Sequence, residues 1–600
     1  MLIKKVILIL LNYLKKMSEI KSIFEFAVQE ETAYKLPIEP VEGWSWSMPS
    51  HLRRSTLYKN SQFEEKNDYR NKRPFKNIIR PILNVQYRTE GFDVKDIVPY
   101  VDNEDNYYKS FLVKKFHDKW AIENQIDTFI DNVVESYIDY GGVLVKDGEE
   151  LEVVNLLSIA FADQTDILSG AFAIKHYFTP SQLREMSAWD KEMVEIAILK
   201  AETSKRQQKD NIASKTPTKY IEVYEIHGSF PDEWIKGEKE KYSQQIHIIS
   251  FYQDDDGQKK GLSFFSKKEP KLPFKFLARD KIFGRALGFG GIEELFESQA
   301  WTNYSEIRIM EILDIASKII YKTTDKALAN RNKTTEMDNG EILFVQEGRD
   351  IGQLDTSPRN LQVFTNALNE WNLHAKEMGG ASDIFLGRQP SAGTPFKSLE
   401  SQIIEAKSLH IYRQGKLAVF MEEIYRDWVI PRIAKEIVKE NKFLAELSVD
   451  ELQEIADKIV TSQANKFVKE KILSGELVLP EDVEQEKLKI KDSFLKGGRK
   501  KFISILKDEF KEEELNVSVN IAGKQKDLAG ITDKWTNILR QILSAPQVLD
   551  DPRMLKILNK LIESSGMSPL DIGGMRPPTQ MPNEMEIPNE MAGKQSLSVV

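Results

Sequence analysis

The chain has 600 residues, 41% hydrophobic and 30% charged, which is the balance of a soluble folded protein. This length exceeds one ordinary core and predicts about three to five structural units. The formal net charge of -9 excludes a generic nucleic-acid binder, which is usually basic. The absence of cysteine excludes disulfides, Cys-type zinc sites, iron–sulfur clusters and thiol catalysis.

The first residues carry a short apolar run, 6–11, with lysines on both sides. It is shorter than the roughly 20 residues that a membrane span requires, and no small-residue cleavage site follows it. We interpret residues 1–16 as an upstream-start segment before Met17 or as a short amphipathic helix. Trp44 and Trp46 follow in an irregular segment, where they either contact a partner or pack in a core.

Helix and strand signals alternate between residues 74 and 280. Apolar residues three and four positions apart predict helices at 74–83, 106–140 and 180–205. β-branched and aromatic runs predict strands at 143–145, 151–157, 220–226, 246–252 and 262–265. The three aspartates before Gly257 predict a hairpin turn and not a metal site, because no histidine or further carboxylate cluster accompanies them.

The helix expected at 292–316 has apolar residues on more than one face, among them Trp301, Met310 and Leu313. Such a helix is buried on more than one side, by neighbouring subunits in a ring or within a single core. Strand-like runs follow at 318–322 and 341–346.

A helix at 359–378 and a longer one that begins at Thr394 come next. Threonine is a good N-cap, and the following proline favours the first helical position. We expect Pro431 to end this long helix, with Gly415 as a candidate kink.

The C-terminal third is largely helical. The charged residues 448–515 are expected to form helices, followed by a strand at 515–521 and helices at 531–543 and 553–564. From residue 566 the composition changes to Pro, Met, Asn and Glu without periodicity, which is typical of a flexible tail.

Catalytic patterns are missing from the sequence. It has no G-x-x-x-x-G-K-[ST], no H-E-x-x-H and no G-x-S-x-G. His374 and His410 lie on different expected helices and are interpreted as packing or surface residues. We therefore expect no catalytic, cofactor-binding or metal site, no cofactor and no enzymatic activity; the pattern favours an architectural protein.

The order of elements resembles the portal proteins of tailed bacteriophages. The segments that carry the resemblance are 73–83, 137–145, 272–313, 318–346, 378–409 and 531–546. It covers about residues 70 to 565 and is a pattern of elements, with no single diagnostic motif. The tryptophan-bearing N-terminal segment and the Met/Pro tail have no counterpart in the family pattern.

The resemblance implies an α+β, helix-rich fold with a wing, a stem, a clip and a crown. The implied segments are an N-terminal arm at 1–70, an α/β wing at 71–290, a first stem helix at 291–316, a clip at 317–356, a second stem helix at 357–380, a tunnel loop at 381–394, a long spine helix at 395–431, a helical crown with associated wing elements at 432–565 and a flexible tail at 566–600.

The resemblance also implies a role and partners. The chain would form a dodecameric ring at one capsid vertex, in the virion and, during assembly, in the host cytoplasm. Its partners would be the major capsid protein, the large terminase subunit, connector and tail proteins, and double-stranded DNA that passes through the channel without sequence-specific contacts. No membrane is implied.

Two groups of residues follow from this assignment. Arg388, Gln389 and Ser391 would face DNA in the tunnel loop, although an intersubunit salt bridge is an equal alternative for Arg388. The clip, which docks the terminase and the connector, would present these cations: Lys322, Lys326, Arg331 and Lys333.

Two other classes of protein are open alternatives. A nucleic-acid-processing enzyme or accessory subunit would use the basic segments 70–88 and 496–501 as DNA patches, but no metal or nucleotide site accompanies them. Another virion connector protein fits less well with the length and the order of elements.

Overall fold

The structure is a computed structural model that describes residues 22–64, 74–100, 107–207, 220–235, 241–254, 259–317, 321–323, 351–353, 361–381, 385–386, 396–439, 449–475, 478–492, 516–519 and 540. These residues fall into two compact units. The first unit holds the described residues of 22–96 and 121–424 together with Val519, and the second holds those of 97–120 and 425–518 together with Arg540.

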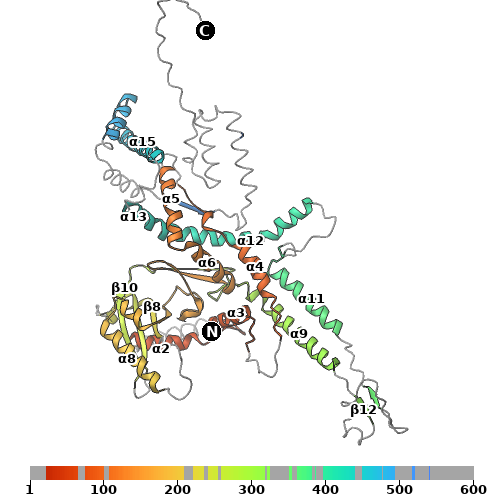
Figure 1. Ribbon diagram of the computed structural model, residues 1–600. Helices are drawn as coiled ribbons and strands as arrows, with labels where there is room; N and C mark the ends of the chain where they lie inside the picture. Colours follow the sequence, from red (N-terminus) through yellow and green to blue (C-terminus); the bar gives the residue numbers. More distant parts are fainter. Residues whose placement is uncertain are drawn as a thin grey trace, which may run out of the picture. The chain divides into compact units, whose positions relative to one another are not determined.

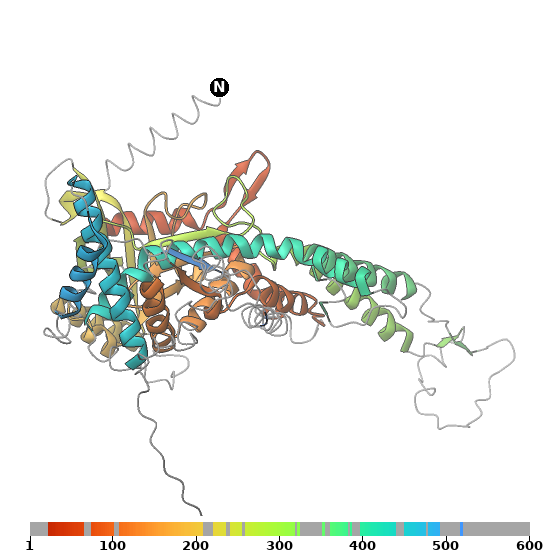
Figure 2. The same cartoon turned by 90° about the horizontal axis from the view of Figure 1, so that it is seen from above.

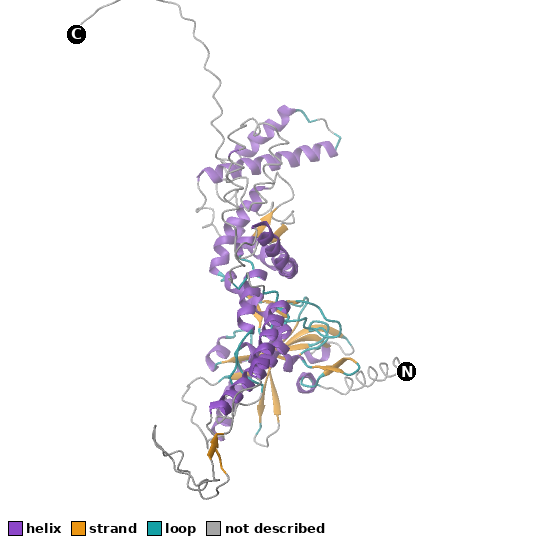
Figure 3. Ribbon diagram, turned by 90° about the vertical axis from the view of Figure 1, so that its right-hand side faces the viewer, coloured by secondary structure: helices purple, strands orange, loops and turns teal. Residues whose placement is uncertain are grey.

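The first unit combines helices with antiparallel sheets (Figures 1 and 3). Its helices are α2 (Ile23–Tyr34), α3 (Met48–Lys59), α4 (Ile79–Glu90), α6 (Ile126–Tyr140), α7 (Pro180–Glu185), α8 (Lys191–Gln207), α9 (Phe296–Ser317), α11 (Leu361–Met378) and α12 (Phe396–Ile424). Its strands are β1 (Ile38–Val41), β2 (Trp44–Trp46), β4 (Gly142–Asp147), β5 (Leu151–Val154), β6 (Ile159–Phe161), β7 (Phe172–Phe178), β8 (Ile221–Pro231), β9 (Tyr242–Gln253), β10 (Lys259–Lys268), β11 (Phe274–Ala278), β12 (Tyr321–Thr323) and β13 (Ile351–Gln353). This mixture is α+β, as the sequence predicts.

The larger sheet has the order β10-β9-β8-β7-β6, with every neighbouring pair antiparallel. Successive residues of a strand point to opposite faces, so Val223 and Tyr224 in β8 enter different cores. The Val223 face packs against α7 and α8, whereas the Tyr224 face belongs to the core that contains α2. The sheet therefore has an apolar layer on both faces.

The N-terminal segment contributes to this core. Phe26 of α2 packs edge-on against Phe161 and Phe230, with ring centroids 5.9 and 5.3 Å apart. Trp46 is buried in the same core, while Trp44 remains partly exposed. Of the two alternatives for these tryptophans, core packing holds for Trp46.

The smaller sheet has the order β11-β4-β5, and its central strand β4 follows directly after α6. Helix α6 ends at Gly141, which has φ +78°. A Cβ there would lie 2.2 Å from the Gly288 carbonyl oxygen, so only glycine allows the chain to turn at this point. Val143, Leu144 and Val145 of β4 are completely buried, in agreement with the short apolar run in the sequence.

Two helices predicted as continuous are interrupted. The helix expected at 106–140 is α5 (Tyr107–Glu123) followed by α6, because Gln125 has φ +51° and breaks the helical backbone. The helix expected at 180–205 is two helices, α7 and α8. A capping box at Thr179 begins the first of these, and the second begins at Lys191.

The second unit is mainly helical among the residues described. Its elements are β3 (Ile97–Tyr100), α5 up to Trp120, the π-helical turn Tyr425–Val429, α13 (Ile430–Lys439), α15 (Val449–Leu473), the helical residues 480–492 and β14 (Asn516–Val519) up to Ser518. Strand β14 pairs with β3. The helices and the tail expected beyond residue 530 lie outside the described residues, apart from Arg540.

Pro431 does not end a helix, contrary to the prediction. It lies in the first turn of α13, immediately after the π-helical turn. Proline is tolerated in a first turn because the amide hydrogen that it lacks would have no helical partner there. No helix in the described parts of the chain has the length and hydropathy required to cross a membrane.

Helices α9 and α11 form a pair that carries β12 and β13 beyond its end (Figures 1 and 2). Trp301 of α9 stacks on Trp371 of α11, with ring centroids 6.0 Å apart and planes 10° apart. The two strands pair antiparallel, so the chain leaves along α9 and returns along α11. The second strand was expected at 341–346, which lies outside the described residues, and the observed partner of β12 is β13.

Candidate functional site

Helix α9 buries polar side chains. Ser298, Gln299, Thr302 and Asn303 are all nearly inaccessible to solvent. The backbone amides of Lys76 and Ile78 donate to the side chains of Asn303 and Gln299 at 3.1 and 2.9 Å, and the Gln299 amide donates to the Lys76 carbonyl at 2.8 Å. The segment before α4 therefore satisfies the side chains of Gln299 and Asn303, whereas the buried Thr302 hydroxyl has no hydrogen-bond partner.

Several large apolar residues of α9 are exposed to solvent. Trp301 and Met310 are each 48% exposed, and Tyr304 and Leu313 are similarly accessible. The sequence predicted that this helix is buried on more than one side, either by neighbouring subunits or within a single core. In the single chain these four side chains do not lie in a core. Helix α11 adds further exposed apolar side chains: Val363, Leu373 and Met378. The α9–α11 pair thus presents apolar surface that this chain does not cover, which is typical of a protein–protein contact surface.

The end of the α9–α11 pair contains the first of the residues predicted for the clip. Lys322 lies in β12, paired with Gly352 of β13, and is exposed. Lys326, Arg331 and Lys333 lie outside the described residues. The same is true of the three residues predicted to face DNA: Arg388, Gln389 and Ser391.

A buried ion network lies where α4, α12 and the segment 279–294 meet. The Arg279 guanidinium donates to both carboxylate oxygens of Glu90, with Nη2–Oε1 and Nε–Oε2 distances of 2.8 and 3.2 Å. Arg413 of α12 donates to Asp280 at 2.9 Å and to Glu294 at 2.5 Å. Charges buried in this way are tolerated because each has an opposite charge within contact distance.

The environment sets the ionisation of the two glutamates differently. Burial acts to raise the pKa of Glu90, but Arg279, His410 and Arg413 outweigh it and hold that pKa below its usual range. Burial also acts to raise the pKa of Glu294, and at that residue burial outweighs the opposing effect of Arg279 and Arg413. The pKa of Glu294 is therefore raised. Glu90 is therefore the firmly ionised centre of the network.

His410 belongs to this network and not to the surface. The sequence analysis interpreted both His410 and His374 as packing or surface residues. In the structure His410 is buried and His374 is exposed. The ring nitrogens of His410 lie 3.0 Å from Glu90 Oε1 and 3.1 Å from the Gly380 carbonyl oxygen. Sequence reasoning missed this network because its members are far apart in the chain and no spacing connects them.

A second ionic cluster joins the two sheets. Glu225 of β8 binds Lys146 of β4 at 2.6 and 2.7 Å and His176 of β7 at 2.8 Å. His227 lies between Glu225 and Glu269, 3.1 and 2.8 Å from them. His227 is buried against the Phe172 and Phe274 rings, and the cluster cross-links the two sheets.

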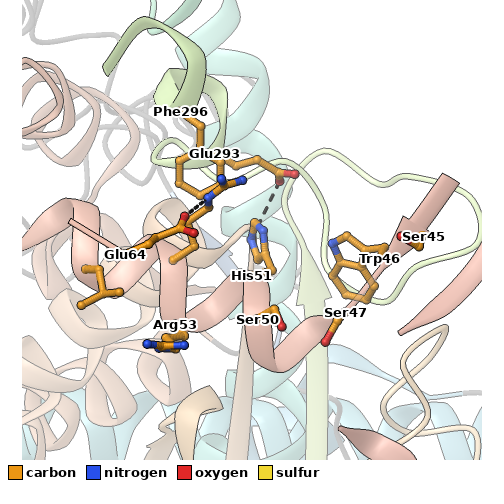
Figure 4. Close-up of a pocket in the computed structure, with 11 residues that line it drawn as sticks. Ser45, Trp46, Ser47, Ser50, His51, Arg53, Glu64, Glu293 and Phe296 are labelled. Carbon is orange, nitrogen blue, oxygen red and sulfur yellow. Dashed lines mark hydrogen bonds and ion pairs between the residues drawn. The ribbon is translucent and has the colours of Figure 1, made fainter. Parts of the chain in front are cut away.

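A polar cavity of about 420 Å³ lies beside α3 (Figure 4). Its carboxylates already have partners, since Glu293 is bound by Arg285 and Glu64 by Arg54. Burial lowers the pKa of His51 at the base of the cavity. Among the described residues, no group of three or more His, Asp or Glu side chains is arranged to hold a metal ion.

No family model matches the chain, and no curated protein sequence matches it. Two solved structures are similar to it. A chain of the virion of native gene transfer agent (GTA) particle is 10% identical with a TM-score of 0.29, and the match covers 68% of this chain and 82% of that one. A chain of the neck of empty GTA particle is 9% identical with a TM-score of 0.30, covering 75% and 100%. Similarity at this level decides neither fold nor function.

Proposed function

We propose that this chain is a structural subunit of a phage-like particle and, specifically, the portal protein that forms a ring at one capsid vertex. The observation that supports it is the exposure of large apolar side chains on α9: Trp301, Tyr304 and Met310. Polar residues of the same helix, among them Gln299 and Asn303, are buried. Exposed aromatic surface of this kind is stabilised when a partner covers it. In a closed ring every subunit has two neighbours, which meet it through different surfaces.

The order of elements agrees with the same role. Two helices joined through a short strand pair, followed by the long helix α12, correspond in order to the stem, clip and spine of the portal family. In this assignment the clip cations Lys322, Lys326, Arg331 and Lys333 dock the terminase and later the connector. The wing contacts the capsid protein, and the crown faces the packaged genome.

The net charge of -9 suits a channel through which DNA moves. A pore lined by many lysines would bind phosphates by releasing counterions and would hold the duplex in place. We assign Arg388, Gln389 and Ser391 to a loop that touches the DNA backbone. Such contacts carry no sequence information, which suits a channel for any genome.

The test is the assembly state of the purified chain and of one pair of variants. We expect native mass spectrometry and negative-stain images to show a closed ring, which Met310→Glu weakens because it places a charge in the apolar surface. Leu199→Glu is the matched control, since Leu199 is 61% exposed on α8, away from the α9–α11 pair. A wild-type chain that stays monomeric at all concentrations, or equal effects of the two variants, would contradict the proposal.

A further inference from the structure

Helices α9 and α11 present an acidic surface as well as an apolar one. Together they carry six carboxylates and two Lys or Arg side chains. Three of the carboxylates, Glu297, Glu370 and Glu377, are exposed and form no ion pair with any described residue. Glu297 lies one turn before the exposed Trp301, and the exposed Leu373 lies between the two glutamates of α11. This surface therefore suits a partner that brings both positive charge and apolar contacts.

Helices α3 and α4 have the opposite charge. They carry five Lys or Arg side chains and a single carboxylate, Glu90, which is completely buried. Arg53, Arg80 and Arg88 are exposed, and no carboxylate in the described part of the chain pairs with them. These three cations are available to the carboxylates of a partner, so α3 and α4 form a basic surface.

A cavity of about 300 Å³ opens within this basic surface, between α3, α4 and α6. Leu83 and Val134 form apolar parts of its lining, and Arg80 lies beside them. Two carboxylates also line the cavity, of which Glu135 is bound by Lys59. An apolar side chain of a partner can enter such a cavity while its carboxylates meet the surrounding cations, as anchoring side chains do at interfaces.

The basic side of α4 faces away from α11. Ile82 and Gln86 contact the turn that follows α11: a Cβ on Gly379 would lie 2.2 Å from the Ile82 side chain, and the Gln86 amide donates to the Gly379 carbonyl at 3.0 Å. Arg80 and Arg88 are each two residues away from this pair, which is about 200° around the helix. The basic surface and the α9–α11 surface are therefore separate, and one chain presents both.

We propose that the α9–α11 surface of one subunit docks on the α3–α4 surface of the next, so the partner is a second copy of this chain. This inference rests on the proposed ring and names the two surfaces that close it. A head-to-tail ring requires two different, complementary surfaces on every subunit. Opposite charges orient this contact, and the exposed apolar side chains of α9 and α11 stabilise it. Docking of the acidic surface on its own copy would place like charges together.

Two charge-reversal variants test this pairing. The basic surface becomes acidic in the first variant, with Arg53→Glu, Arg80→Glu and Arg88→Glu, and the acidic surface becomes basic in the second, with Glu297→Lys, Glu370→Lys and Glu377→Lys. Each variant alone places like charges at every contact. We therefore expect the concentration required for ring assembly, measured by native mass spectrometry, to rise about tenfold or more.

An equal mixture of the two variants should assemble as the wild-type chain does. In an alternating ring, the two acidic surfaces of one variant meet the two basic surfaces of the other. The matched control reverses three exposed lysines outside both surfaces: Lys191→Glu, Lys267→Glu and Lys271→Glu. It changes the net charge as much as the first variant and should assemble at the wild-type concentration.

Several outcomes would overturn the pairing and leave the proposed ring standing. These are rings from either variant alone at the wild-type concentration, an equal loss in the control, or a mixture that stays unassembled. One arm needs no variant to fold: wild-type assembly should weaken as sodium chloride rises from about 0.05 to about 0.5 M, because salt screens the charges, and assembly that does not weaken overturns the pairing. A wild-type chain that stays monomeric overturns the ring and the pairing together.

Discussion

Replacing Arg279 with methionine measures how much the buried network stabilises the first unit. The side chains of Arg279 and Glu90 are both 0% exposed. Methionine fills much of the volume of arginine but leaves the Glu90 carboxylate without its bidentate partner. Removing one member of a buried ion pair costs about 3–5 kcal/mol, because the remaining charge stays out of water without compensation.

The matched control is Arg308→Met on α9. Arg308 also pairs with a glutamate, Glu311, at 2.7 Å, but the two side chains are 48% and 53% exposed. Water screens an exposed pair and solvates the partner that remains, so little stability is lost. The two substitutions are chemically identical and differ in burial.

Equilibrium urea unfolding followed by tryptophan fluorescence provides the measurement. We expect Arg279→Met to destabilise the transition of the first unit by about 3–5 kcal/mol. The additional change Glu90→Leu should restore part of that loss, since it removes the unpaired carboxylate. Equal losses for Arg279→Met and Arg308→Met, or a double variant that loses the sum of the single changes, would refute the reasoning.

The same pair makes stability depend on pH. The pKa of Glu90 is lower in the folded chain than its ordinary value, so its contribution is present above the unfolded pKa and is lost as pH falls through the folded pKa. Arg279→Met removes the main cause of that low pKa. We therefore expect the stability difference between wild type and Arg279→Met to shrink in acid, as measured by urea unfolding at a series of pH values.

Three other predictions concern separate parts of the chain. Burial acts to lower the pKa of His227, but Glu225 and Glu269 outweigh burial and raise that pKa. Protonated His227 therefore stabilises the fold at low pH, and this contribution is lost as the pH rises through the folded pKa. We expect the thermal midpoint of His227→Gln to converge on that of the wild-type chain in alkali. A Cβ on Gly261 would lie 2.0 Å from the Phe24 ring of α2, so Gly261→Ala should cost about 1–3 kcal/mol in urea unfolding, whereas Gly170→Ala, with nothing within 4 Å, should cost less. Shortening residues 385–392 should leave ring assembly intact and reduce encapsidated DNA, with a milder reduction for Arg388→Ala; normal DNA content in the shortened chain would contradict the channel assignment.

The local elements could be predicted from the sequence because their signals are local. Apolar spacing predicted α9, and the glycines at 141 and 142 predicted the end of α6. The helix expected at 74–83 was only partly correct, since residues 74–78 are not helical and α4 runs from Ile79 to Glu90. Runs of β-branched and aromatic residues predicted β8, β9 and β10 of the larger sheet but not β6 or β7. Each of these signals depends on backbone geometry within a few residues.

Tertiary structure decided what these elements face. Apolar residues on several sides of α9 could not reveal that Gln299 and Asn303 would be buried and Trp301 exposed, because the segment at residues 76–78 supplies the partners of the polar groups. Pro431 could not be predicted to begin a helical segment, because that depends on the π-helical turn before it. The His410 ring lies within hydrogen-bond distance of Glu90 and Gly380, which are 320 and 30 positions away, and only folding brings groups so distant in sequence into contact.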